Sequence, residues 1–217
     1  MTPEIKFCGM TRAGDVSVAS SLGASYVGVI FAGGPRHQTP DGASRVFAGT
    51  APPPKRVGVV GEQTAQEIAE LVEALQLDVV QLHANPEPRR LEAVRAATNA
   101  SVWAVLRIAD GALPPHADAL ASSAHAIVLD AHTAGGLGGS GVTLPWAKLA
   151  PALEAVRRES LLVLAGGLRP DNVAAAIAAL YPDVVDVSSG VESAPGIKDH
   201  VRMRAFRDAV AGAGVKK

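Results

Sequence analysis

The sequence predicts a single-domain α/β protein with the (β/α)8 barrel fold, the TIM barrel, over residues 1–217. Short apolar runs alternate with helical segments along the whole chain. The runs are continuously apolar, as expected for a parallel sheet that helices cover on the outside. Consecutive parallel strands require right-handed crossovers, and this many units close most simply into a barrel. A doubly wound open sheet is the structural alternative.

The expected strands are short, rich in Val, Ile and Leu, and several stop at a glycine or a polar residue. Six are Ile5–Cys8, Tyr26–Phe31, Arg56–Val60, Asp78–Leu82, Val102–Leu106 and Ala126–Leu129. The last two begin at Leu161 and Val184 and end in Ala165-Gly166-Gly167 and Ser188-Ser189-Gly190.

Helix signals fill the intervals between these strands. Thr39-Pro40 is an N-cap followed by proline at the first helical position, and Thr64 to Glu67 form a capping box. The other expected helices are Ala13–Leu22, one opened by Asn85-Pro86, a weak one near Pro115–Ser122, one containing Trp146 and Leu153, one starting at Pro170, and Asp199–Val210.

Composition excludes several classes of protein. Hydrophobic residues make up 48% of the chain and charged residues 19%, which favours a large core over disorder. The formal charge of −1 argues against a nucleic-acid partner. No apolar run reaches the ~20 residues of a membrane span, so we expect no membrane partner. A single cysteine suits a reducing cytoplasm, where we expect the protein.

The carboxyl ends of the strands carry the candidate functional residues, at the end of a barrel where active sites lie. Small residues after the last two strands let backbone N–H groups approach a phosphate, so we expect a small-molecule phosphorylated substrate. The residues at these ends are Cys8, Arg36, Gly61, His83, Arg107, Asp130, Gly166 and Ser188.

Three of these side chains each have a plain structural alternative. Cys8 is either a buried small hydrophobe or, as a thiolate, a base or nucleophile. Asp130 ends an apolar run, so it must be solvated, paired, used or serve as a helix N-cap. Arg36 is either a solvated surface charge or a bidentate ligand for a carboxylate. His37, His83 and His132 lack a recognisable metal-ligand spacing, so we expect no metal or cofactor.

Motifs along nearly the whole chain resemble those of the phosphoribosylanthranilate isomerases. The resemblance begins with Lys6-Phe7-Cys8-Gly9-Met10-Thr11 and with Phe31 through Pro35-Arg36. It continues in order through Val80-Gln81-Leu82-His83, Leu129-Asp130-Ala131, Gly138-Gly139-Ser140-Gly141, Ala165-Gly166-Gly167-Leu168, Asp186 to Glu192, and Gly196-Ile197-Lys198-Asp199. Gly34, Ala84, Ser140, Leu144-Pro145 and an extra Gly135-Gly136-Leu137 depart from the family pattern, which leaves the geometry of the sixth loop open.

This resemblance implies a metal-free Amadori rearrangement of N-(5-phosphoribosyl)anthranilate to 1-(2-carboxyphenylamino)-1-deoxyribulose 5-phosphate. It needs no cofactor, and it would use Asp130 as the acid and Cys8 as the base. It implies that Arg36 binds the anthranilate carboxylate. We expect phosphate contacts from four residues, which are Gly141, Gly167, Ser189 and Gly190. Both a monomer and a homodimer are compatible with the sequence.

Strand alternation gives a further expectation, because Lys6 and Cys8 point to the same side, as do Asp186 and Ser188. The first and last strands are neighbours in a closed barrel. We therefore predict that Lys6 and Asp186 lie inside the barrel, paired beneath Cys8, with His83 as a further supporting residue. The alternative is that each charge is solvated separately at the rim.

Two other kinds of protein fit part of the pattern. Another phosphate-binding barrel would favour an aspartate at position 8, as in an aldose–ketose isomerase of histidine biosynthesis, or metal-binding histidines, as in a ribulose-phosphate epimerase. A catalytically silent phosphate-binding protein would also keep the barrel, but the presence of both Cys8 and Asp130 argues against it.

Overall fold

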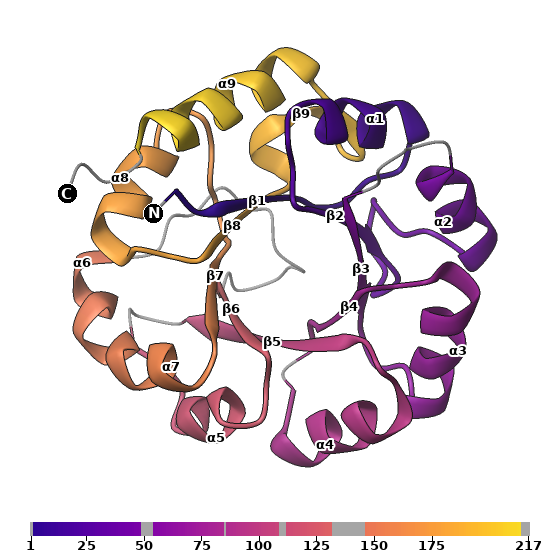
Figure 1. The fold of residues 1–217 in the computed structure, drawn as a ribbon, viewed down its shortest axis with the longest axis vertical. Helices are drawn as coiled ribbons and strands as arrows, with labels where there is room; N and C mark the ends of the chain where they lie inside the picture. The colour runs from indigo at the N-terminus through magenta and orange to yellow at the C-terminus, as the bar shows by residue number, and fades with distance from the viewer. Residues whose placement is uncertain (1, 49–53, 85, 109–111, 132–145, 214–217) are drawn as a thin grey trace.

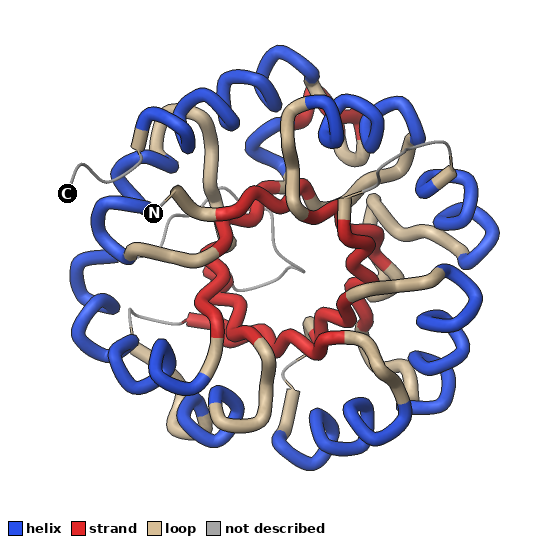
Figure 2. The backbone as a smooth tube through the Cα atoms, viewed as in Figure 1, coloured by secondary structure: helices blue, strands red, loops and turns tan. Residues whose placement is uncertain are grey.

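The computed structural model describes residues 2–48, 54–84, 86–108, 112–131 and 146–213. Its eight parallel strands form a closed barrel in the order of the chain, β1 to β8. Viewed down the barrel, the strands form an inner ring and the helices an outer ring (Figures 1 and 2). The predicted (β/α)8 barrel is therefore confirmed, and the open sheet is excluded because β1 pairs with β8.

The strands lie close to their predicted positions. Their bounds are β1 Glu4–Phe7, β2 Tyr26–Ile30, β3 Lys55–Val60, β4 Val79–Leu82, β5 Ser101–Ile108, β6 Ala126–Ala131, β7 Leu161–Leu164 and β8 Val184–Val187. Strands β5 and β6 extend further than the sequence predicts, since their backbones stay paired through Arg107↔Asp130 and Ile108↔Ala131. Asp130 is thus part of a strand and not a helix N-cap.

The helices cover the outside of the barrel. They are α1 Ala13–Ser21, α2 Pro40–Phe47, α3 Ala65–Leu75, α4 Pro88–Ala97, α5 Ala117–Ala121, α6 Trp146–Leu149, α7 Glu154–Glu159, α8 Val173–Leu180 and α9 His200–Gly212. In the described part of the chain no helix has the length and apolar character that crossing a membrane requires.

Capping explains where several helices begin. The Thr39 side chain accepts a hydrogen bond from Gly42 N, and the Thr64–Glu67 capping box is present, as predicted. Two predicted starts are wrong by a few residues: α4 begins at Pro88 instead of Pro86, and α8 at Val173 instead of Pro170. In α8 the Asn172 side chain instead accepts from Arg169 N, which closes a turn before the helix.

The helix predicted around Trp146 is divided into three segments. A 3₁₀ turn, η1 Ala150–Leu153, separates α6 from α7. Pro151 lies in this turn, and proline cannot donate the backbone hydrogen bond that a continuous α-helix needs at that position. The apolar face is nevertheless retained, because Leu149, Leu153 and Val156 are all buried.

A short segment after β8 was not predicted. It consists of a 3₁₀ turn, η2 Ser189–Val191, and a two-stranded hairpin of β9 Glu192–Ala194 and β10 Ile197–Lys198. Gly196 forms its turn with φ +79, a conformation that favours glycine. The hairpin lies next to the start of the chain, because Thr11 Oγ1 donates a hydrogen bond to Gly196 O at 2.5 Å.

Alternate residues on each strand point into the barrel. Toward the starts of the strands they form an apolar plug, in which the rings of Tyr26 and Trp103 meet edge to face with centroids 5.0 Å apart. Above this plug the inward positions become polar, and they include Lys6, Gln81 and Asp186. The interior of the barrel is therefore apolar toward the starts of the strands and polar toward their carboxyl ends.

Lys6 and Asp186 form an ion pair inside the barrel, as the alternation predicts. They are register partners on β1 and β8, and Lys6 Nζ lies 2.7 Å from Asp186 Oδ2. The side chain of Lys6 is fully buried and that of Asp186 is 6% exposed. Gly28 on β2 leaves room for Lys6 and Cys8, because a Cβ there would lie 3.4 Å from Lys6 Cε and 2.9 Å from Cys8 Sγ.

The loops that follow β7 and β8 pack unusually closely. A Cβ on Gly190 would lie 1.9 Å from Leu168 O, so only glycine fits between these two backbones. Gly166 and Gly167 both have positive φ, which turns the chain sharply after β7. The two loops therefore form one compact unit at the carboxyl end of the barrel.

We expect Lys6→Met to lower the free energy of unfolding by about 3–5 kcal/mol, because it leaves the carboxylate of Asp186 buried without its cation. Adding Asp186→Asn should recover most of this loss by removing the stranded charge. Urea unfolding of the single and double variants measures both effects. Arg158→Met is a matched control, since the Arg158–Glu154 pair is exposed, and it should change stability by less than about 0.5 kcal/mol. A loss of stability of similar size in Lys6→Met and in Arg158→Met would contradict the prediction.

Gly190→Ala should destabilise the protein by about 1–3 kcal/mol or more, because its methyl group overlaps the carbonyl of Leu168. Gly14→Ala is the control, since a Cβ on this α1 residue has no neighbour within 4 Å. It should be neutral or stabilise the protein by up to about 1 kcal/mol. Thermal and urea unfolding measure the stability of both variants. An equal change in stability in Gly190→Ala and Gly14→Ala would refute the prediction.

Candidate active site

A cavity opens at the carboxyl end of the barrel, where the strand ends and their loops meet. Of the ten residues to which the sequence gives a role, nine lie in the described part of the chain. Those that line the cavity are Cys8, Arg36, His83, Asp130, Gly167, Asp186, Ser189 and Gly190, while Lys6 lies beneath it in contact with Asp186. The tenth residue, Gly141, lies outside the described residues.

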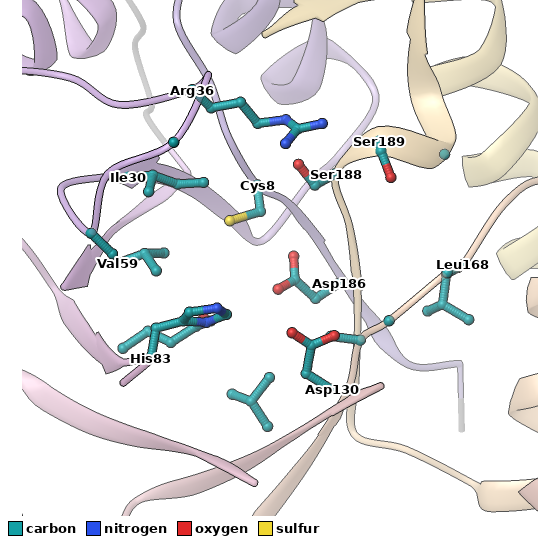
Figure 3. A pocket seen from close by; sticks show the side chains of 18 of the residues that line it. Cys8, Ile30, Arg36, Val59, His83, Asp130, Leu168, Asp186, Ser188 and Ser189 are labelled. Carbon is teal, nitrogen blue, oxygen red and sulfur yellow. The ribbon is translucent and has the colours of Figure 1, made fainter. Parts of the chain in front are cut away.

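The two sides of the cavity differ in chemistry (Figure 3). Ile30 and Val59, from β2 and β3, give one side an apolar surface, with His83, directly after β4, next to them. Asp186, Ser188 and Ser189 from the end of β8 lie on the opposite side. Such a cavity suits an elongated ligand with an aromatic or aliphatic group at one end and an oxygen-rich group at the other.

Cys8 and Asp130 both reach this cavity, from β1 and β6. Cys8 is 6% exposed and Asp130 is 8% exposed, so neither is a solvated surface group. The amide of Cys8 donates to Val187 O at 2.9 Å, which fixes the thiol next to the end of β8. A thiol and a carboxyl group on one water-poor cavity are a possible base and acid for moving protons on a bound ligand.

The charges below the cavity act on the thiol. Burial raises the pKa of Cys8, because a thiolate is poorly solvated there, and the negative Asp186 adds to this effect. The cation of Lys6 opposes both and favours the thiolate. Burial alone would lower the pKa of Lys6, but Asp186 and Cys8 together outweigh burial and hold that pKa above its ordinary value. Lys6 therefore remains a permanent cation beneath Cys8.

His83 is neutral under ordinary conditions. Burial, followed by the nearby charge of Arg107, lowers its pKa to about 4. Within the described part of the chain its Nδ1 atom has no hydrogen-bond partner. His83 is therefore an uncharged hydrogen-bonding group facing the cavity.

Several buried polar atoms around the cavity lack a partner among the described residues. They are Gln81 Oε1, His83 Nδ1, Asp186 Oδ1 and Ser188 Oγ, all on residues that line the cavity. Buried polar groups are normally satisfied, so a cluster of exceptions indicates that a polar ligand completes them. Gln81 was not singled out from the sequence, although an amide inside the apolar run Val79–Leu82 was the available signal.

Arg36 is not a solvated surface charge. Its Nη2 lies 2.7 Å from Glu192 Oε2 and its Nε lies 2.9 Å from Glu192 Oε1, with 13% of its side chain exposed. Glu192 also accepts a hydrogen bond from Lys198 Nζ at 2.8 Å. The sequence motifs contain both partners, but nothing in their spacing shows that they meet Arg36.

The loops after β7 and β8 could hold an anion. Gly167, Ser189 and Gly190 border the cavity together, and Ser189 and Gly190 begin the 3₁₀ turn η2. In (β/α)8 barrels, these two loops and the start of a short extra helix commonly form a phosphate site. In the described ranges, no group of three or more His, Cys, Asp or Glu side chains is arranged to hold a metal ion.

The chain is similar in sequence to known proteins of one family. The family model for N-(5'phosphoribosyl)anthranilate (PRA) isomerase matches residues 5–209. An N-(5'-phosphoribosyl)anthranilate isomerase of Geobacillus thermodenitrificans is 36% identical over 206 residues, covering 94% of this chain and 92% of the relative. The homologue of Paramagnetospirillum magneticum is 36% identical and covers 98% of this chain and 99% of the relative.

Solved structures give the same result. The crystal structure of phosphoribosyl anthranilate isomerase from Thermotoga maritima superposes with a TM-score of 0.85 at 30% identity, covering 97% of this chain and 99% of that one. Another structure of such an isomerase, in complex with reduced 1-(o-carboxyphenylamino)-1-deoxyribulose 5-phosphate, has a TM-score of 0.81 at 28% identity, with 97% and 99% covered. The chain belongs to the N-(5'-phosphoribosyl)anthranilate isomerase family.

Proposed function

We propose that this protein is the isomerase of tryptophan biosynthesis that converts N-(5-phosphoribosyl)anthranilate into 1-(2-carboxyphenylamino)-1-deoxyribulose 5-phosphate. The observation that carries this proposal is that Cys8 and Asp130 line one cavity with an apolar side and a polar side. The anthranilate ring suits the side of Ile30 and Val59. The sugar phosphate suits the side of the β7 and β8 loops.

Asp130 acts as the acid. It donates a proton to the ring oxygen of the ribose, the bond between C1 and that oxygen breaks, and the nitrogen lone pair forms a protonated Schiff base at C1. Burial of the carboxyl group at 8% exposure supports this role, because proton transfer there does not compete with bulk water.

Cys8 acts as the base, as its thiolate. It removes the proton from C2, and the electron pair of that C–H bond forms the C1–C2 double bond of an enolamine while the iminium nitrogen becomes neutral. Tautomerisation then gives the ketone at C2. Lys6 supports the step because its cation favours the thiolate, against the burial that raises the pKa of Cys8.

Binding is shared by the two ends of the cavity. Gly167, Ser189, Gly190 and Gly141 are the proposed phosphate contacts, and Arg36 is the proposed contact of the anthranilate carboxylate. His83 is a neutral hydrogen-bond partner, since its pKa of about 4 leaves it uncharged. This chemistry requires no metal or cofactor, and the base must remain a free thiol, which suits a cytoplasmic enzyme.

Cys8→Ala and Asp130→Asn should each lower kcat by about 10²–10⁴-fold, because each removes one of the two proton-transfer groups. A fluorescence assay that follows the loss of freshly prepared phosphoribosylanthranilate measures this. Circular dichroism and urea unfolding should show that both variants remain folded. Turnover close to wild type in either folded variant would refute the role assigned to that residue.

The free energy of unfolding should fall as the pH drops from about 6.5 toward 4, and His83 should cause part of this fall. In that range the unfolded chain protonates His83, whereas the folded chain, with the pKa lowered to about 4, does not. His83→Asn should make the loss of stability over this range smaller. Urea unfolding at several pH values tests the prediction, and an unchanged pH dependence in the variant would contradict it.

A further inference from the structure

Glu192 lies between two cations at the edge of the cavity. Its Oε2 is 2.7 Å from Arg36 Nη2, and its Oε1 is 2.8 Å from Lys198 Nζ. The side chains of Glu192 and Lys198 are 4% and 0% exposed, so this is a buried cluster rather than a surface ion pair. Arg36 is the member that lines the cavity, on the side of Cys8 and Ser188 (Figure 3).

The cluster does not balance its own charge. Two cations share one carboxylate, which leaves one positive charge that the Cys8 thiolate, once formed, or an anionic ligand can offset. Lys6 and Asp186 nearby already neutralise each other. An uncompensated buried charge is costly unless another group pairs with it. A ligand carboxylate beside Arg36 would provide that pairing.

The backbone around Glu192 is held firmly in place. Arg202, on α9, donates a hydrogen bond to Glu192 O at 2.5 Å. Lys198 Nζ donates one to Ser188 O at 3.1 Å. On the opposite side, Arg36 packs across Gly9, where a Cβ would lie 2.6 Å from Arg36 Cδ. Arg36 comes from the loop after β2, so its guanidinium depends on the β9–β10 hairpin for its orientation.

We propose that Glu192 is a positioning residue, which holds the guanidinium of Arg36 in the orientation that binds the carboxylate of the substrate. This inference rests on the proposed function. Glu192 occupies Nε and Nη2 of Arg36, and the substrate carboxylate uses the N–H groups that Glu192 leaves. Lys198 donates a hydrogen bond to Oε1 of the same carboxylate at 2.8 Å, which fixes Glu192 in place while it contacts Arg36.

The test compares the binding of two ligands by isothermal titration calorimetry. The first is reduced 1-(o-carboxyphenylamino)-1-deoxyribulose 5-phosphate, and the second is the same compound without its carboxyl group. Glu192→Gln should weaken binding of the first about ten- to a hundredfold, the range for a charge-assisted hydrogen bond, and leave binding of the second nearly unchanged. In the isomerase assay KM should rise while kcat changes by less than about threefold.

Four further variants, one of them a control, distinguish positioning from a structural role. Arg36→Met should weaken binding of the carboxylated ligand at least as much as Glu192→Gln does. Adding Glu192→Gln to Arg36→Met should weaken that binding no further. Glu192→Asp, which keeps the charge but has a shorter reach, should give an intermediate loss and serves as the test if Glu192→Gln does not fold. Glu154→Gln, at an exposed ion pair, is the control and should bind both ligands as the wild type does.

Several outcomes would overturn the inference. Equal weakening of both ligands would show that Glu192 supports the phosphate site or the fold in general. Tighter binding of the carboxylated ligand would show that Glu192 competes for Arg36 instead of orienting it. Additive effects of the two substitutions would show that they act independently. If the wild type turns over phosphoribosylanthranilate and Glu192→Gln binds the carboxylated ligand as tightly as the wild type does, only this inference is refuted. If the wild type shows neither turnover nor binding, the proposed function is refuted as well.

Discussion

The buried ion pair between Lys6 and Asp186 is the interaction on which the rest of the site depends. It joins the first strand to the last at the level where the apolar plug ends and the cavity begins. Because burial makes an unpaired charge costly, the pair holds these two strands in one register. That register places Cys8 beside the end of β8. The same pair sets the charge beneath the thiol, since Lys6 favours the thiolate while burial and Asp186 oppose it.

Glycine provides the space that this arrangement needs. Gly28 leaves room for the thiol and for Lys6, Gly9 lets Arg36 cross the end of β1, and Gly190 lets two loops touch. At each of these glycines another backbone or a functional side chain passes closer than a Cβ would allow. The small residues at the carboxyl end of the barrel therefore act by allowing close approach, which is what both a phosphate site and a crowded catalytic cavity require.

The two ion clusters have different relations to the cavity. Lys6 with Asp186 is balanced and lies below the thiol, whereas Arg36, Glu192 and Lys198 leave one positive charge at the edge. A substrate with a carboxylate on an aromatic ring and a phosphate on a sugar carries negative charge at both ends. In the binding mode proposed above, the positive cluster binds the carboxylate and the glycine loops bind the phosphate, with Cys8 and Asp130 between them.

The sequence by itself determined the fold and predicted that the candidate site lies at the carboxyl ends of the strands, where the cavity is found. Continuous apolar runs, caps such as Thr64 and the alternation of Lys6 with Cys8 act over a few residues, so they can be interpreted locally. Only the tertiary structure decided that Glu192 and Lys198 meet Arg36, that Gln81 faces the cavity and that a hairpin follows β8. Arg36 and Glu192 are 156 residues apart. Their contact depends on how two distant loops pack at the end of a closed barrel, and no local pattern in the sequence records that packing.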